Sequence, residues 1–107
     1  MKRQVLSLQE RKQELLITEA YQIFRRVKVN NNLSDRTIKH YDKMMELLEK
    51  FYDDMSKVYC HDITSDTVEE FIEFLKSRNP DIKATSINSY LKDLRGILYY
   101  LMDRESV

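Results

Sequence analysis

The sequence predicts an all-α protein, a compact bundle of four helices. The 107 residues include only one glycine, Gly96, and one proline, Pro80, whereas sandwiches and barrels need turn residues about every ten positions. Apolar residues recur at i, i+3, i+4 and i+7 along most of the chain, which is the spacing of amphipathic helices. A chain of this size buries roughly two-thirds of its unfolded surface, enough for one core but not for a large substrate cleft as well.

The first predicted helix runs from Leu15 to Val29. Its inward positions are Leu16, Ala20, Ile23, Phe24 and Val27. Residues 1–14 are highly polar and form an extension that either lengthens this helix or frays. Three consecutive asparagines, residues 30–32, end the helix because Asn competes for backbone hydrogen bonds and tolerates left-handed geometry.

The second predicted helix spans Asp35–Tyr52. Ser34 is placed to cap it, and the Asp35 carboxylate favours its positive N-terminal end. Its predicted buried positions are Ile38, Tyr41, Met45, Leu48 and either Phe51 or Tyr52, with Met44 at or beside the core. Residues 53–62 are predicted to be a connection that contains a short turn packed on the core.

The third predicted helix spans Ser65–Ser77 and begins after a capping residue, Thr64. Its inward positions are Val68, Phe71, Ile72 and Leu75, and its solvated side carries Asp66, Glu69, Glu70 and Glu73. Residues 79–81 are Asn-Pro-Asp, which is a strong break because proline disfavours helix at the preceding residue.

The fourth predicted helix spans Ala84–Asp103. Its inward positions are Ile87, Tyr90, Leu91, Leu94, Ile97, Leu98 and Leu101. Gly96 lies in the middle of this helix, where glycine costs about 1 kcal/mol relative to alanine. Either another backbone approaches closely at this position, or the helix tolerates the cost.

The net charge of zero conceals a polarised chain. Residues 1–32 contain seven basic and three acidic side chains, residues 53–75 one basic and seven acidic, and residues 76–107 six basic and four acidic. This distribution is compatible with one face for a polyanion and another that faces away. Ordinary solvated helix faces give the same distribution, so charge alone leaves both interpretations open.

Several classes of protein and site are excluded. The single cysteine, Cys60, forms no internal disulfide, which suits a reducing, cytoplasmic location. No apolar run has the length of a membrane span or a signal peptide. Cys60 and His61 are adjacent in a connection, where a metal site would need further ligands and a nucleophile pair would need a cleft. We therefore predict no catalytic residue, no metal and no cofactor in this chain.

Two predicted helices begin with similar sequences, 49 residues apart. Thr37–Tyr41 resembles Ser86–Tyr90, each with a hydroxyl residue, then Ile, then Tyr three residues later. Apolar residues follow at corresponding positions, Met45 with Leu94 and Leu48 with Ile97. Amphipathic patterning alone also produces such a match, which is too short to establish a duplication.

The matched helices carry two polar stripes beside their buried faces. We call the set on the second helix the basic stripe: Arg36, Lys39, His40 and Lys43. The donor stripe on the fourth helix comprises Thr85, Asn88, Ser89, Lys92 and Arg95. Neither contains a carboxylate, and Asp42, Glu46, Glu49 and Asp93 are predicted to lie elsewhere around the helices. Long cations suit phosphates, and Asn, Ser, Thr and Arg also reach base edges, although any amphipathic helix has a solvated side.

Four segments, taken in order, resemble the core-binding domain of tyrosine recombinases, the phage-integrase family. They are Ile17–Phe24 (ITEAYQIF), Leu33–Tyr41 (LSDRTIKHY), Asp62–Phe71 (DITSDTVEEF) and Thr85–Arg95 (TSINSYLKDLR). The resemblance covers about Leu15–Asp103 and implies a SAM-like bundle of orthogonal helices, with residues 104–107 starting a linker to a catalytic domain. Lys83 departs from the family, which often has Ser or Thr before the fourth helix.

The resemblance also implies a role. In this family the core-binding domain and the catalytic domain clamp double-stranded DNA from opposite sides, and the second and fourth helices approach the major groove. The implied DNA-binding residues are both stripes together with Thr37 and Lys83. The acidic third helix would face away from phosphate, and neighbouring recombinase protomers would be further partners on DNA.

The family's catalytic chemistry is not expected in this chain. Strand exchange needs a Tyr nucleophile with Arg, Lys and His groups of the catalytic domain, and neither His40 nor His61 has Arg three residues later. We therefore expect a monomeric domain without activity of its own, either a fragment of a recombinase or a stand-alone binding domain. The alternative is a helical protein-interaction or regulatory module, which an exposed apolar patch of several hundred Å² would indicate.

Overall fold

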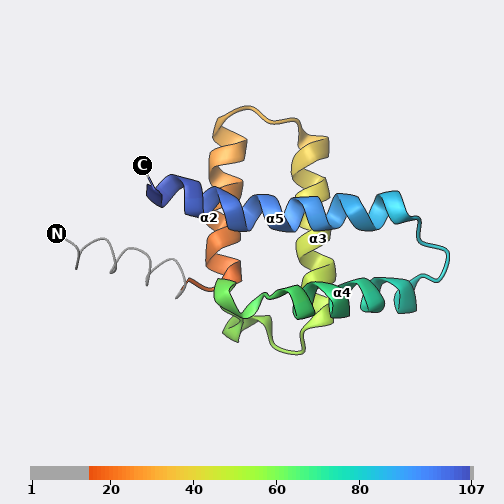
Figure 1. Ribbon diagram of the computed structural model, residues 1–107. Coiled ribbons are helices and arrows are strands. Elements are labelled where there is room, and N and C mark those ends of the chain that lie inside the picture. The colour runs from red at the N-terminus through yellow and green to blue at the C-terminus, as the bar shows by residue number, and fades with distance from the viewer. Residues whose placement is uncertain (1–14, 107) are drawn as a thin grey trace.

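The computed structural model describes the backbone of residues 15–106 and the side chains of residues 15–100. It contains α2 (Ile17–Asn30), α3 (Asp35–Phe51), the 3-10 turns η1 (Met55–Lys57) and η2 (Cys60–Asp62), α4 (Ser65–Arg78) and α5 (Ala84–Ser106). Figure 1 shows α2 and α3 side by side, with α5 crossing both and α4 running across the end of α3. The predicted all-α class and the bundle of four orthogonal helices are confirmed.

Hydroxyl caps begin two of the helices as predicted. The Thr37 N–H donates to Ser34 Oγ over 3.3 Å at the start of α3, and the two side-chain oxygens lie 2.9 Å apart. At the start of α4 the Thr67 N–H donates to Thr64 Oγ1 over 3.4 Å. Each cap satisfies a backbone donor that has no partner within its helix. The residue pattern therefore fixes where α3 and α4 begin.

The connections also follow from local chemistry. Asn32 adopts φ of 60° between α2 and α3, the left-handed geometry that Asn tolerates better than most residues. The predicted turn after α3 consists of η1 and η2, where Met55 and Val58 are buried. This segment is fixed to the start of α2, because the Ile17 N–H donates to Val58 O over 2.9 Å and the Cys60 N–H donates to Leu15 O over 2.8 Å.

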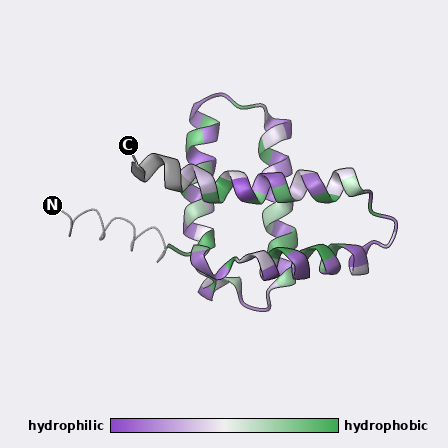
Figure 2. Ribbon diagram, viewed as in Figure 1, coloured by the Kyte–Doolittle hydropathy of each residue, from purple (hydrophilic) through white to green (hydrophobic). Residues whose placement is uncertain are grey.

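The core contains residues of all four helices, and Figure 2 shows hydrophobic and hydrophilic residues interspersed along each of them. Phe71 of α4, Leu48 of α3 and Ile97 of α5 are fully enclosed. Residues at matched positions are buried in both helices: Ile38 and Ile87, Met45 and Leu94, and Leu48 and Ile97. The similar sequences of the two helices therefore describe similar buried faces.

The predicted elements are all present, with small differences at their ends. The first predicted helix begins at Ile17 instead of Leu15, and the last continues to Ser106, beyond the predicted Asp103. Tyr21 and Leu47 are buried although neither was in a predicted stripe. A Cβ added to Gly96 would meet no atom within 4 Å, so tolerance and not close packing explains this glycine. The polar extension 1–14 and the side chain of Leu101 lie outside the described residues.

Candidate nucleic-acid interface

The basic stripe lies on the solvent side of α3. Arg36, Lys39, His40 and Lys43 are all exposed, and they flank the buried Ile38 on the same helix. Thr37 is exposed too, but its side chain serves the cap with Ser34. The cap holds the first turn of α3, and the buried face sets the rotation of the helix about its axis. The helix therefore fixes the direction in which this row of side chains leaves the surface.

The donor stripe lies on the solvent side of α5. Its members are exposed, as is Lys83 immediately before the helix: Lys83, Thr85, Asn88, Ser89, Lys92 and Arg95. The neighbouring Ile87, Leu91 and Leu94 are buried. The alternation of buried and exposed positions therefore fixes this row as firmly as the one on α3.

The two stripes meet at a contact between α3 and α5. The His40 ring stacks on Tyr90 with ring centroids 5.3 Å apart and planes 17° from parallel. His40 Nδ1 also contacts Oδ2 of Asp93. The Asp93 side chain is only 13% exposed, and this burial raises the pKa of its carboxyl group, while the hydrogen bond from His40 acts in the opposite direction. His40 is thus the residue of the basic stripe that touches the other helix.

This contact corrects the expectation that Asp93 lies away from the stripes. The prediction treated each helix separately, so it did not show that Asp93, four residues after Ser89 on α5, faces α3. Because α5 crosses α3, the edge of α5 that carries Asp93 faces His40. A second carboxylate, Glu46 Oε1, lies 3.8 Å from Lys43 Nζ. The polar surface is therefore less free of carboxylates than the sequence indicated.

Most cations of the two stripes, and Lys83 beside them, lack an ion-pair partner among the described side chains. Within residues 15–100, no carboxylate lies within 4 Å of Arg36, Lys39, Lys83, Lys92 or Arg95. Other cations are engaged: the Arg25 guanidinium pairs with Asp42 at 2.9 Å, and Lys50 Nζ lies 3.3 Å from Glu46. Unpaired cations on a rigid face are available to an anionic ligand, since no internal pair must first break.

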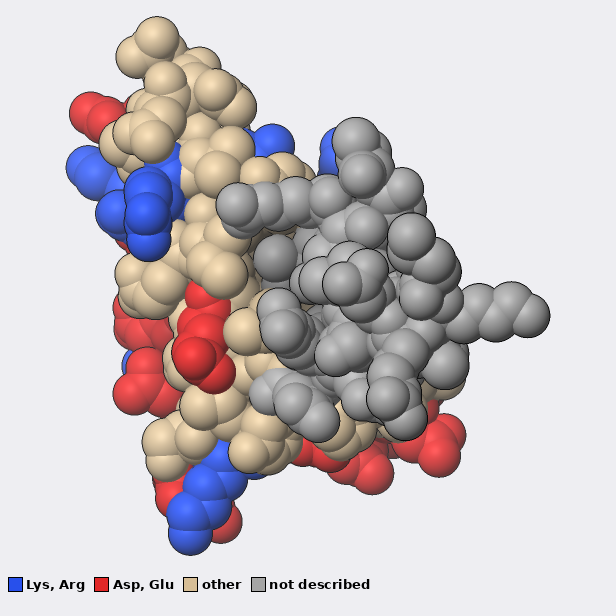
Figure 3. Space-filling view, turned by 90° about the vertical axis from the view of Figure 1, so that its left-hand side faces the viewer, with Lys and Arg blue, Asp and Glu red and all other residues tan. Residues whose placement is uncertain are grey.

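Acidic residues dominate another element. Asp66, Glu69, Glu70 and Glu73 of α4 are all exposed. On the face beside α2 that Figure 3 shows, Lys and Arg gather at the upper and lower ends of one edge, with Asp and Glu between them. That face has no continuous basic area in its coloured part. The stripes on α3 and α5 are therefore better placed for a polyanion than either of these regions.

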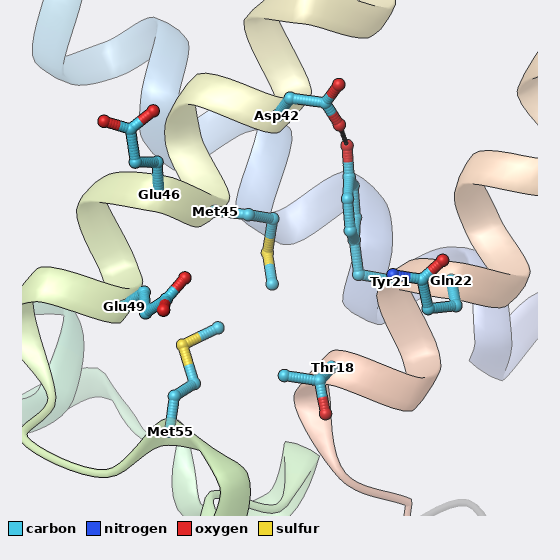
Figure 4. Close-up of a pocket in the computed structure, with 8 residues that line it drawn as sticks. All are labelled: Thr18, Tyr21, Gln22, Asp42, Met45, Glu46, Glu49 and Met55. Atoms are coloured by element: carbon cyan, nitrogen blue, oxygen red, sulfur yellow. Dashed lines mark hydrogen bonds between the residues drawn. The ribbon is translucent and has the colours of Figure 1, made fainter.

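A separate cavity of about 240 Å³ opens between α2, α3 and η1. Figure 4 shows Met45 and Met55 pointing into it and Tyr21 reaching towards Asp42 at one end. The Tyr21 hydroxyl and the Arg25 guanidinium both bind the Asp42 carboxylate. This network was not predicted from sequence, because residues 17 to 21 positions apart on different helices give no periodic signal.

The described residues offer no catalytic or metal-binding constellation. No group of three or more His, Cys, Asp or Glu side chains among them could hold a metal ion. Burial raises the pKa of the Cys60 thiol to about 11, so it is a poor nucleophile at neutral pH. Among the described helices, none is both long and apolar enough to cross a membrane.

Sequence reasoning missed three residues at the place where the stripes meet. Tyr90 was predicted to be core, yet it is only partly buried and stacks on His40. Asp93 was placed elsewhere, and Ser86 entered only as the start of the segment Ser86–Tyr90, which resembles Thr37–Tyr41. The hydroxyl of Ser86 corresponds to that of Thr37, and this correspondence was the one available signal.

Comparison with known proteins identifies one family. The model of the phage integrase SAM-like domain matches residues 18–105, which is most of the chain. Neither the curated proteins nor the solved structures yield a significant match.

Proposed function

The chain belongs to the phage integrase SAM-like domain family, and from this premise we propose that it binds double-stranded DNA through the basic stripe and the donor stripe. The domain would hold one side of a recombination site while a catalytic domain outside these residues breaks and rejoins the strands. Neighbouring protomers on the DNA would be further contacts. On its own this domain would be monomeric and without catalytic activity, and it would act in the cytoplasm.

The observation that carries the proposal is the meeting of two polar helix faces. α3 and α5 cross, and His40 of the basic stripe packs against Tyr90 of α5. Five cations of this surface have no carboxylate within 4 Å among the described side chains. Two crossing helices supply phosphate-binding cations on one and base-reaching Asn and Ser side chains on the other. The acidic α4 would stay away from the DNA backbone.

The surface offers little support for the alternative of a protein-interaction module. Among residues 15–100 the exposed large hydrophobics are Val29 at 47%, Tyr59 at 39% and Tyr99 at 58%. They lie on three separate elements, and single exposed apolar side chains are normal on soluble domains.

A titration of a DNA duplex into the isotope-labelled domain at low salt tests the proposal. We expect amide shifts along Arg36–Lys43 and Lys83–Arg95, with weak affinity because few cations take part. Each phosphate contact should contribute about 0.9 to the slope of log K against log salt. Lys39→Gln and Arg95→Gln should each reduce that slope by about one contact.

A matched control uses Lys57→Gln, which removes a cation of η1 that pairs with Asp54 at 3.9 Å. It should leave both the affinity and the slope unchanged. Shifts confined to α4, or none at all, would refute DNA binding by this surface. Saturable shifts upon addition of a protein partner, with no response to DNA, would favour the alternative module.

A further inference from the structure

We propose that a hollow between α3 and the first turns of α5 holds a single phosphate of the DNA backbone, with His40 as a ligand and Asp93 as its positioning residue. The inference rests on the proposed function and deepens it. It assigns a role to Ser86, Tyr90 and Asp93, which lie beside the two stripes. It also identifies one defined phosphate site within the larger basic surface.

The hollow has a volume of about 150 Å³. One water occupies roughly 30 Å³ in the liquid, so the hollow has space for the oxygens of one phosphate group after its waters leave. Five residues line it: His40, Thr85, Ser86, Ser89 and Tyr90. All of these side chains carry hydrogen-bond donors, and none is a carboxylate. Such a lining favours an anionic, oxygen-rich ligand over a cation.

His40 is held in one orientation by two contacts from α5. Tyr90 fixes the plane of the ring by stacking, and Asp93 binds Nδ1. Nε2 has no partner among the described residues, so it is the ring atom left for a ligand. The proposed ligand is the imidazolium form of the ring, in which Nε2–H donates to the phosphate and the ring carries a positive charge. Lys92 adds positive charge next to Asp93.

Asp93 lies outside the lining of the hollow. Its carboxylate contacts Nδ1, whose hydrogen-bonding direction diverges from that of Nε2. Its side chain is mostly covered. The Asp93 carboxylate therefore acts by orienting the ring.

The hydroxyl groups of the hollow are also available. In α3 and α4 the third residue is Thr37 or Thr67, and its hydroxyl pairs with the hydroxyl of the capping residue. In α5 the third residue is Ser86, but Lys83 stands at the capping position and has no hydroxyl. Within the described part of the chain, no side-chain hydrogen bond engages Thr85, Ser86 or Ser89. Three serine and threonine hydroxyls from α5 and the imidazole ring of His40 from α3 thus line one space.

Duplex titrations over a series of salt concentrations test the site. His40→Gln keeps an amide donor but removes the charge, so it should weaken binding roughly fivefold and reduce the salt slope by about 0.9. Ser86→Ala with Ser89→Ala removes only neutral donors, so it should weaken binding with the slope unchanged. His61→Gln is the matched control, since it makes the same substitution beside the acidic α4, and it should change neither quantity.

The positioning role of Asp93 has its own readout. The 15N shifts of the His40 ring report which nitrogen carries a proton. In the wild-type protein, duplex should shift Nε2 as a donor. In Asp93→Asn this shift should be reduced and the salt slope should fall as in His40→Gln, while circular dichroism shows an unchanged fold. An Asp93→Asn protein with the wild-type ring shifts and slope would overturn the positioning role.

The outcomes separate this inference from the proposed function. If wild-type protein binds duplex and His40→Gln binds with the same slope, the phosphate site is wrong while DNA binding stands. If wild-type protein does not bind duplex, the proposed function fails as well. Inorganic phosphate is the final arm: shifts of His40 and Ser89 with phosphate but not with duplex would assign the hollow to a free anion and overturn the DNA assignment.

Discussion

The surroundings of Asp42 and Asp93 shift the pKa values of these two carboxyl groups in opposite directions. The Arg25 guanidinium binds Asp42 through two hydrogen bonds of 2.9 and 3.0 Å, and these bonds lower the pKa of Asp42, with burial opposing them. Burial is the largest effect on Asp93 and raises its pKa. The Tyr21 hydroxyl also binds Asp42, which together with burial raises the pKa of Tyr21. Asp42 therefore stabilises the α2–α3 pair in its ionised form.

The pH dependence of stability tests the role of Asp42. Because its pKa in the folded protein is lower than the ordinary 3.8, its contribution is fully present above pH 3.8 and is lost as the pH falls through the folded value. Asp42→Asn should therefore be less stable by about 1 kcal/mol at pH 7, a modest figure because the carboxylate is 41% exposed. The difference should narrow below pH 3.8.

Urea denaturation of both proteins between pH 7 and pH 3 measures this difference. Asp53→Asn provides the control, because Asp53 is exposed at the end of α3 and makes no ion pair with the described residues. Its stability should follow that of the wild type throughout. A difference between Asp42→Asn and wild type that widens towards low pH would contradict the assignment.

At the scale of the element, the residue before α3 and the residue before α4 each cap the helix with a side-chain hydroxyl, whereas the residue before α5 does not. Ser34 and Thr64 bind the third residue of α3 and α4. Lys83 stands at the corresponding place before α5, where the Ser86 and Ile87 N–H groups reach only the Lys83 carbonyl, at 3.0 and 3.2 Å. The start of α5 therefore lacks a side-chain cap and gains a cation. This exchange favours an anionic ligand over helix stability.

Lys83→Ser should raise the stability of the domain and lower its affinity for DNA. A serine would cap α5 in the way that Ser34 caps α3, and we expect a gain of about 0.5–1 kcal/mol in the free energy of unfolding. DNA affinity should fall, and the salt slope should decrease by about 0.9. Thermal or urea unfolding gives the first quantity, and duplex titration gives the second.

Lys76→Ser is the matched control, because Lys76 is an exposed lysine in the last turn of α4, where a serine creates no cap. Lys76→Ser should not raise the free energy of unfolding, and it should leave the salt slope unchanged. Lower stability of Lys83→Ser would show that the lysine side chain supports α5 in some other way.

The sequence predicted these elements well because each depends on neighbours along the chain. Caps lie three residues from the donors they satisfy, and buried stripes recur every three or four residues. Leu47 was missed because α3 is covered on a wider arc than one stripe, by α2, α4 and α5. Tyr21 was missed because its side chain bonds to Asp42 on another helix, a contact that leaves no signal in the sequence pattern. Along the first helix the prediction also placed Leu16 and Val27 inward, whereas the core cluster contains neither of them and does contain Ile17.

At the scale of the whole molecule, the way in which helices cross determines contacts between them that the sequence pattern does not predict. Periodicity predicted that the two stripes exist, and the burial of Ile38 and of Ile87 beside them agrees with that prediction. It could not predict that Asp93 meets His40 across 53 positions, because this depends on the crossing of α3 and α5. The hollow between those helices was invisible for the same reason.

The charge of the molecule is also a matter of arrangement, since 18 basic and 18 acidic residues cancel in the total. Attraction for DNA must then come from the local field of the stripes. The Debye length is about 8 Å at physiological salt, so charges of α4 that do not approach the DNA backbone should have little influence there. The net charge of zero should therefore weaken the attraction between protein and DNA at long range, and it should have less effect on direct contacts between the stripes and phosphates.

A pair of triple variants tests this separation of faces. The α4 variant Glu69→Gln, Glu70→Gln, Glu73→Gln should change duplex affinity by less than about twofold at 150 mM salt, with an unchanged slope. The stripe variant Arg36→Gln, Lys39→Gln, Arg95→Gln removes as many charges of opposite sign, and it should reduce the slope by about 2.7 and the affinity by about a hundredfold. The two variants are matched in the number of charges they remove, because each neutralises three exposed side chains. Equal and opposite effects of the two variants would show that net charge governs binding, and the assignment of DNA to α3 and α5 would then lose its physical basis.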